Sequence, residues 1–237
     1  MNKTFSSNML KTFQDCPKKY YLEYEKKIQI PQDISFSQTG KNLHSIINYY
    51  LKGFNTDKLS SALTKEEQAL WENFLSLNIT KDVTLESEYT FNIKTIQGFW
   101  LTGRIDAITK ENEIYTIYDW KTGKTPSNPK EDLQTLIYLF ALDKILKSKE
   151  GEEKSKILRF VYINLKKAES TDIFIQNELF DNIEGTISDI IKEIKDFSES
   201  VIFTDRVNLD KIFKNYTKNK KCSTCKFHSI CKTDVFL

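Results

Sequence analysis

Residues 101–123, LTGRIDAITKENEIYTIYDWKTG, decide the fold of this 237-residue chain. Two segments that mix Ile, Tyr and Trp with polar residues flank a short polar turn at 110–112, which predicts an antiparallel β-hairpin. Residues i and i+2 of a strand share a face, so Arg104 projects with Asp106, and Asp119 with Lys121. We therefore expect Asp106 and Asp119 to meet on one face of a sheet, with Lys121 beside them.

Two adjacent carboxylates suit a hard divalent cation such as Mg²⁺ or Mn²⁺. An ammonium group next to the cation can orient or deprotonate a water molecule, which is the chemistry of metal-assisted hydrolysis. The alternative is an ordinary solvated hairpin on which acidic and basic residues alternate. The hairpin alone leaves both interpretations open.

The flanking sequence predicts further helices and strands. A helix over 131–148 places Gln134 and Tyr138 one turn apart on a shared face. A helix over 41–53 carries His44, which by itself is more typical of a packed core residue than of a ligand. The other expected elements are a helix from Ser6 or Ser7, a helix over 64–77 with a Thr64–Glu67 capping box, strands over 85–93, 157–165 and 171–176, and a helix over 179–197.

GRIDA, then DWKTG, then a helix with Gln134 and Tyr138 resembles the RecB-like branch of the PD-(D/E)XK nuclease superfamily. This chain has no proline before Asp106, a common departure in that branch. The resemblance implies an α/β (α+β) fold with a restriction-endonuclease-like core, a central mixed sheet flanked by helices. It implies a single nuclease domain over 1–237, with a helical part over 1–78, the core over about 80–180 and a Cys-rich segment over 205–237.

The resemblance also implies a role for each motif residue. Asp106, Asp119 and Lys121 would be catalytic. His44, Asp106, Asp119 and the backbone carbonyl of Trp120 would bind Mg²⁺ or Mn²⁺, and Gln134 and Tyr138 would contact the DNA strand. Glu86 and Glu88 could be extra acids near the site, but we expect them to face solvent from their strand.

Four cysteines form a second motif: Cys16 stands alone, and Cys222, Cys225 and Cys231 follow as C-x2-C-x5-C. Thiolates at such spacing select zinc or an iron–sulfur cluster, and His228 lies close enough in sequence to replace one of them. The arrangement resembles the iron–sulfur members of the RecB-like branch. That resemblance implies a [4Fe–4S] cluster that joins the two ends of the chain, with structural Zn²⁺ as the alternative.

The net charge of +2 is unevenly distributed: residues 1–30 carry +3, residues 205–237 carry +5, and the middle carries −6. Basic ends around an acidic middle suit a metal site flanked by phosphate-binding surfaces. No apolar run approaches the roughly 20 residues of a membrane span, and the first residues lack a signal-peptide core. We therefore expect a cytoplasmic protein without a membrane partner.

Together these features predict a metal-dependent deoxyribonuclease. The resemblance favours an exonuclease on single-stranded DNA or DNA ends, in repair, recombination or CRISPR adaptation, with a helicase or CRISPR adaptation partner. The alternative is a catalytically inert iron–sulfur accessory subunit that binds DNA. Against it, Asp106, Asp119 and Lys121 are all present.

Overall fold

A computed structural model describes residues 4–31, 35–79, 84–150, 157–175, 180–202, 213 and 222–233. The chain divides into two compact units. The first comprises Ile34–Ile93 and Leu101–Glu184 and contains the hairpin with every residue of the predicted nuclease site. The second comprises Met1–Asp33, Lys94–Trp100 and Gly185–Leu237 and contains the four cysteines.

The first unit is built on a mixed sheet. Strand β3 pairs antiparallel with β4, β4 parallel with β5, and β5 antiparallel with β6, while β2 also pairs with β3. Helix α6 lies between β4 and β5 in the chain and supplies the crossover that a parallel pair requires. The bounds are Thr84–Lys94 (β2), Trp100–Glu111 (β3), Ile114–Lys121 (β4), Leu133–Glu150 (α6), Ile157–Asn164 (β5) and Glu169–Ile175 (β6).

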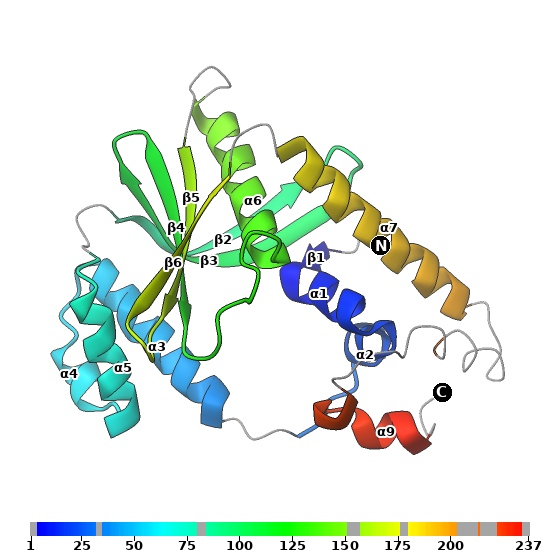
Figure 1. The fold of residues 1–237 in the computed structure, drawn as a ribbon, viewed down its shortest axis with the longest axis horizontal. Coiled ribbons are helices and arrows are strands. Elements are labelled where there is room, and N and C mark those ends of the chain that lie inside the picture. Colours follow the sequence, from blue (N-terminus) through cyan, green and yellow to red (C-terminus); the bar gives the residue numbers. More distant parts are fainter. Residues whose placement is uncertain are drawn as a thin grey trace. The chain divides into compact units, whose positions relative to one another are not determined.

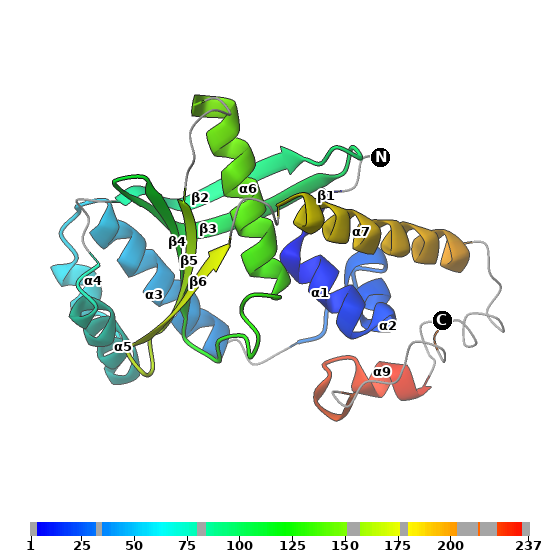
Figure 2. The ribbon, with the colours of Figure 1, turned by 45° about the horizontal axis from the view of Figure 1, so that its top comes forward.

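Helices cover both faces of this sheet, as Figures 1 and 2 show. Helices α3 (Ser35–Leu51) and α5 (Lys65–Ser76), drawn in blue to cyan with α4 (Asp57–Ser61) beside them, lie on one side, and the green α6 lies on the other. A buried cluster joins α3 and α5 to the sheet through Leu43, Ile47, Trp71, Phe74, Ala107, Trp120 and Val161. The predicted mixed sheet flanked by helices is thereby confirmed.

Two local expectations differ from the structure. The hairpin turn lies at Asn112–Glu113 and not at 110–112, because Glu111 already pairs with Ile114. Asn112 has φ +54°, a conformation that Asn tolerates better than Lys or Glu. Helix α3 begins at Ser35, six residues before the predicted start, since a glycine such as Gly40 weakens a helix without ending it.

The second unit is mainly helical. It includes the strand β1 (Thr4–Ser6), α1 (Ser7–Asp15), α2 (Pro17–Tyr20), a π-helical turn at Tyr21–Glu25, most of α7 (Phe180–Ile202), a short turn at Cys222–Thr224 and α9 (His228–Thr233). The Ser6 side chain accepts a hydrogen bond from Met9 N–H and caps α1, as predicted. Rings of Phe13, Tyr20, Phe197 and Phe213 pack edge-on or tilted against one another in its interior. No helix in the described ranges is long and apolar enough to cross a membrane.

Candidate functional site

The two predicted carboxylates stand side by side at the open end of the hairpin. Ala107 of β3 lies opposite Tyr118 of β4, so Asp106 and Asp119 are the next residues along their strands. Opposite residues of an antiparallel pair point to the same face. Both carboxylates are almost fully buried, with 6% and 3% of their surfaces exposed. The structure thus brings them together as the hairpin predicted.

Lys121 is held beside these acids by two partners. Its Nζ atom lies 2.7 Å from Asp119 Oδ2 and donates a hydrogen bond of 3.0 Å to Gln134 Oε1. Gln134 Nε2 in turn donates to Asp119 Oδ1 at 2.5 Å. Gln134 of α6 therefore fixes the geometry of the Asp119–Lys121 pair through direct hydrogen bonds with both side chains. The predicted contact of Gln134 with DNA stays a prediction.

His44 of α3 completes the arrangement. Its Nδ1 lies 3.2 Å from Asp106 Oδ1, and its Nε2 lies 3.1 Å from the backbone carbonyl oxygen of Trp120. Asp106 Oδ2 accepts a hydrogen bond of 2.9 Å from the Trp120 backbone N–H. Contacts among these atoms thus bring together three of the predicted cation ligands, His44, Asp106 and the Trp120 carbonyl, from a helix, β3 and β4.

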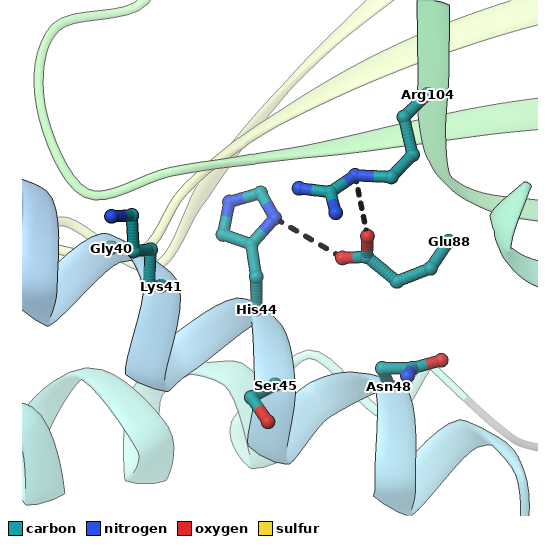
Figure 3. Close-up of a pocket in the computed structure, with 7 residues that line it drawn as sticks. All are labelled: Gly40, Lys41, His44, Ser45, Asn48, Glu88 and Arg104. Atoms are coloured by element: carbon teal, nitrogen blue, oxygen red, sulfur yellow. Dashed lines mark ion pairs between the residues drawn. The ribbon is translucent and has the colours of Figure 1, made fainter. Parts of the chain in front are cut away.

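Glu88 lies in the site, although the sequence favoured a solvent-facing position over a place among the site acids. It was expected to face solvent, but its carboxylate lies 3.6 Å from His44 Nδ1 and 2.7 Å from Arg104 Nε. Figure 3 shows Glu88 of β2 between these two side chains. Potential ligand atoms of His44, Glu88 and Asp106 lie within 4.8 Å of one another, whereas Asp119 does not belong to this group.

The backbone explains why Glu88 turns toward His44. Glu88 has φ +53°, a left-handed conformation that is unusual for a residue of this size and interrupts the alternation of β2. Such strained conformations cluster at functional sites, where surrounding contacts enforce them. The neighbouring Ser87 is buried and donates a hydrogen bond to Asn48 of α3, which anchors β2 at this point.

The charges of the site shift the pKa values of its members. Burial, followed by the charge of Asp106, raises the pKa of Asp119 to about 6. Burial opposes protonation of His44, but hydrogen bonds with Asp106 and Glu88 outweigh it and raise the pKa of His44 to about 10. Burial, with Asp119 and Asp106 after it, raises the pKa of Tyr138 to about 12. The site therefore concentrates negative charge that a cation would neutralise.

Tyr138 of α6 is packed rather than open to solvent. Only 7% of its surface is exposed, and the Arg104 backbone and the Gln134 side chain hydrogen-bond with its hydroxyl group. Its ring packs edge-on against Phe91 at a centroid distance of 5.5 Å. The predicted contact of Tyr138 with DNA stays a prediction.

Gly103 of the GRID motif makes room for this packing. A Cβ atom at Gly103 would lie 2.5 Å from Phe91 Cζ and 2.9 Å from Tyr138 Cε1, well inside van der Waals contact. We expect Gly103→Ala to lower the free energy of unfolding by about 1–3 kcal/mol, because two buried rings must move. Urea denaturation measures this change.

Gly123 supplies the matched control. A Cβ atom there would meet no atom within 4 Å, so Gly123→Ala should change the free energy of unfolding by less than about 0.5 kcal/mol. Equal losses of stability in the two variants would contradict the packing role of Gly103.

The four cysteines lie near one another in the second unit. Burial raises the pKa of the Cys16 thiol, and Cys225 and Cys222 raise it further. Burial likewise raises the pKa of Cys231, on which Cys225, Cys16 and Cys222 also act. Cys16 Sγ accepts a hydrogen bond of 3.4 Å from Lys19 N–H at the start of α2. The charges of the late cysteines thus act on Cys16, and a ligand set shared by all four cysteines stays a prediction.

One protein family and several solved structures are similar to this chain. No curated protein sequence matches the chain. Among solved structures, it is similar to a candidate exonuclease from Eubacterium rectale, with 12% identity, 82% of each chain covered and a TM-score of 0.49. It is also similar to the protein SSO0001, with 18% identity, 99% of this chain and 88% of the other covered, and a TM-score of 0.49. The model of one family matches residues 4–232, a range that includes every site residue described above, and the chain therefore belongs to the PD-(D/E)XK nuclease superfamily.

Proposed function

We propose that this protein is a metal-dependent deoxyribonuclease that acts as an exonuclease on single-stranded DNA or DNA ends. The observation that carries the proposal is the buried pair Asp106 and Asp119 with Lys121 held beside it by Gln134. This arrangement combines ligands for a hard cation with an ammonium group at hydrogen-bond distance. Repair, recombination and CRISPR adaptation are the processes that such an activity would serve, with a helicase or an adaptation complex as partner.

The residues present fit a divalent cation. His44, Glu88 and Asp106 offer ligand atoms within 4.8 Å of one another, and Asp119 and the Trp120 carbonyl would complete the ligand set. Oxygen ligands suit Mg²⁺, and the imidazole shifts the preference toward Mn²⁺. When bound, the cation would lower the pKa of a water molecule and stabilise charge on the scissile phosphate.

The chain's own residues would orient the reaction. Lys121 Nζ, fixed by Gln134 and Asp119, would hydrogen-bond with the attacking water and keep it in line with the phosphorus atom. The Asp119 carboxylate, buried next to Asp106, would stay oriented because Gln134 Nε2 donates a hydrogen bond to one of its oxygens. A low-dielectric site of this kind strengthens each of these interactions.

We further propose that the four cysteines hold a [4Fe–4S] cluster. Two observations support a shared ligand set. Besides burial, other cysteines of the set raise the pKa of Cys16 and of Cys231, and Cys16 Sγ accepts a hydrogen bond from Lys19 N–H. The order of one early and three late cysteines, with C-x2-C-x5-C spacing, resembles the iron–sulfur members of the RecB-like branch and supports iron over the zinc alternative.

A nuclease assay tests the proposed activity. The full chain is incubated with 5′-labelled, 3′-labelled and circular single-stranded DNA in Mn²⁺, Mg²⁺ or EDTA. An exonuclease degrades the linear strands with either cation, releases label first from one end, and leaves circles intact. Cleavage of circles would assign an endonuclease, and cleavage that persists in Asp119→Ala would indicate a contaminant. Absence of cleavage under all conditions would favour the accessory role.

Cation binding should release a proton from His44. Since the pKa of His44 is raised to about 10, the metal-free ring is protonated at pH 7, and a ligand nitrogen must be unprotonated. We expect about one proton released per Mn²⁺ at pH 7 and an affinity that rises about tenfold per pH unit between pH 7 and 9. Calorimetry in buffers of different ionisation enthalpy measures the proton.

The variant His44→Gln serves as the control for this linkage. It removes the titrating ring, so the number of protons released per Mn²⁺ should fall close to zero even where Mn²⁺ still binds. Binding by the parent chain without proton release would show that His44 is not a ligand.

In the absence of a cation, the ion pairs of His44 add stability below a pH of about 6.5, and this contribution is lost as the pH rises through about 10.

A further inference from the structure

The solvent-facing stripe of α3 begins at the candidate site and runs away from it. Lys41, Ser45, Asn48 and Tyr49 are spaced so that they fall on one side of the helix, and Lys52 follows directly after its last residue. Four of them are exposed, and Asn48 is half-buried. Polar and cationic groups occupy the end near His44, and an aromatic residue follows one turn later. The stripe therefore offers two kinds of contact in a fixed order.

The first part of the stripe lines a cavity of about 520 Å³ beside His44, shown in Figure 3. Within the described parts of the chain, Lys41 has no ion-pair partner. Asn48 Oδ1 accepts a hydrogen bond of 2.7 Å from Ser87, so the Asn48 amide group keeps its own N–H donors for a ligand. The Glu88 carboxylate is already engaged by Arg104 at 2.7 Å. The cavity thus presents more donors than acceptors, as a phosphate site does.

The second part of the stripe is an exposed aromatic pair. Tyr49 and Phe54 keep 43% and 58% of their surfaces exposed, and their ring centroids lie 5.8 Å apart at 70°. The helix ends here in a tight turn: Phe54 N–H bonds to Tyr49 O, Gly53 N–H bonds to Tyr50 O, and Gly53 has φ +79°. This turn holds the Phe54 ring against Tyr49, so the pair is a preformed platform.

We propose that this face of α3 binds the single strand next to the reacting nucleotide, with a phosphate in the cavity and unpaired bases stacked on Tyr49 and Phe54. The proposal rests on the nuclease function above and adds a binding surface to it. Exposed rings that follow a cavity lined by Lys41 and Arg104, with Lys52 next to them in the sequence, suit a polyanion that carries π-faces better than an apolar protein surface. Bases of a duplex stack on each other and cannot reach the rings, so the surface selects single strands.

A binding experiment tests the platform without relying on cleavage. The full chain carrying Asp119→Asn is titrated, in EDTA, against a fluorescent 20-nucleotide thymidine strand and a 20-base-pair duplex. Replacing Tyr49 and Phe54 with Leu keeps an apolar contact at the helix end but removes the π-faces. We expect at least a tenfold loss of affinity for the single strand and no change for the duplex. Tyr49→Phe with Phe54→Tyr should restore the affinity.

A second measurement tests the phosphate contact. Lys41→Gln should lower the slope of log affinity against log salt by about 0.7 for the single strand, the value of one phosphate contact. Matched controls are Lys192→Gln, which replaces an exposed lysine of α7, and Phe174→Leu, which replaces an exposed phenylalanine of β6. Neither control should change single-strand affinity.

Several outcomes would overturn the proposal. Unchanged single-strand affinity in the Leu variant would exclude stacking of bases on the two rings. An equal loss of affinity for the single strand and the duplex would exclude a preference for single strands. If the Leu variant instead loses self-association while DNA binding persists, the rings form a protein contact. These outcomes leave the nuclease function untouched. Failure of the parent chain to cleave DNA would reject that function and would not alter the affinities measured here.

Discussion

Asp119→Asn is expected to lower the rate of DNA cleavage at least a thousandfold while the chain stays folded. Asn has nearly the same shape and can still accept the hydrogen bond from Gln134 Nε2. It lacks the charge that binds a cation and that pairs with Lys121 at 2.7 Å. A thousandfold loss corresponds to about 4 kcal/mol of transition-state stabilisation. Initial rates on single-stranded DNA with saturating Mn²⁺ measure the effect.

The same substitution has a second, opposite signature. Because burial and Asp106 raise the pKa of Asp119 to about 6, the folded chain holds this proton more tightly than the unfolded chain does. The stability from protonated Asp119 is therefore full below a pH of about 4 and is lost as the pH rises through about 6. In EDTA, we compare the unfolding free energies of Asp119→Asn and the parent chain. As the pH rises over this range, the variant should gain stability relative to the parent by on the order of 1–3 kcal/mol.

Asp172→Asn is the matched control for cleavage. Asp172 lies on β6, pairs with Arg159 near the surface and is 38% exposed. It should leave cleavage unchanged. Parent-like cleavage by Asp119→Asn would reject the assignment of Asp119, and lost cleavage together with lost folding would point to a structural role.

Local patterns were enough to predict the hairpin and its acids. Side chains alternate between the two faces along a β-strand. The sequence of the hairpin is therefore enough to predict that Asp106 and Asp119 lie together. The order of three strands, a helix and a strand follows from the same alternation and from the length of the apolar run in α6. His44 was harder, because its place beside Asp106 depends on how α3 packs against the sheet.

Glu88 shows where such patterns fail. A strand read by strict alternation sends Glu88 to solvent, but the backbone at this residue has φ +53° and turns the carboxylate to His44. A single residue outside the strand conformation reverses the side of its neighbours, and the letters ESE carry no signal for it. The role of Gly103 was equally hidden, since it follows from the positions of Phe91 and Tyr138 in the folded chain.

Replacing cysteines is expected to have the largest effect on stability. Cys16 and Cys222 are 206 residues apart, so a cluster that both bind closes almost the whole chain into a loop. Closing a loop of that length stabilises the folded state by roughly 5 kcal/mol in the chain-entropy model. Cys16→Ser opens this loop and leaves only the short Cys222–Cys231 loop. We expect it to remove most of that stability, measured by anaerobic urea denaturation with iron and sulfide content.

Cys231→Ser separates loop closure from the loss of one ligand. It leaves Cys16, Cys222 and Cys225 in place, so a cluster held by three cysteines still closes the long loop. The difference between loops of 206 and nine residues is worth roughly 3 kcal/mol, so Cys16→Ser should be the less stable variant by about this amount. His228→Ala controls for the same segment and should keep its iron if the four cysteines are the ligands. A colourless parent with one zinc per chain, or equal stability of the two serine variants, would show that no iron–sulfur cluster joins the ends in this way.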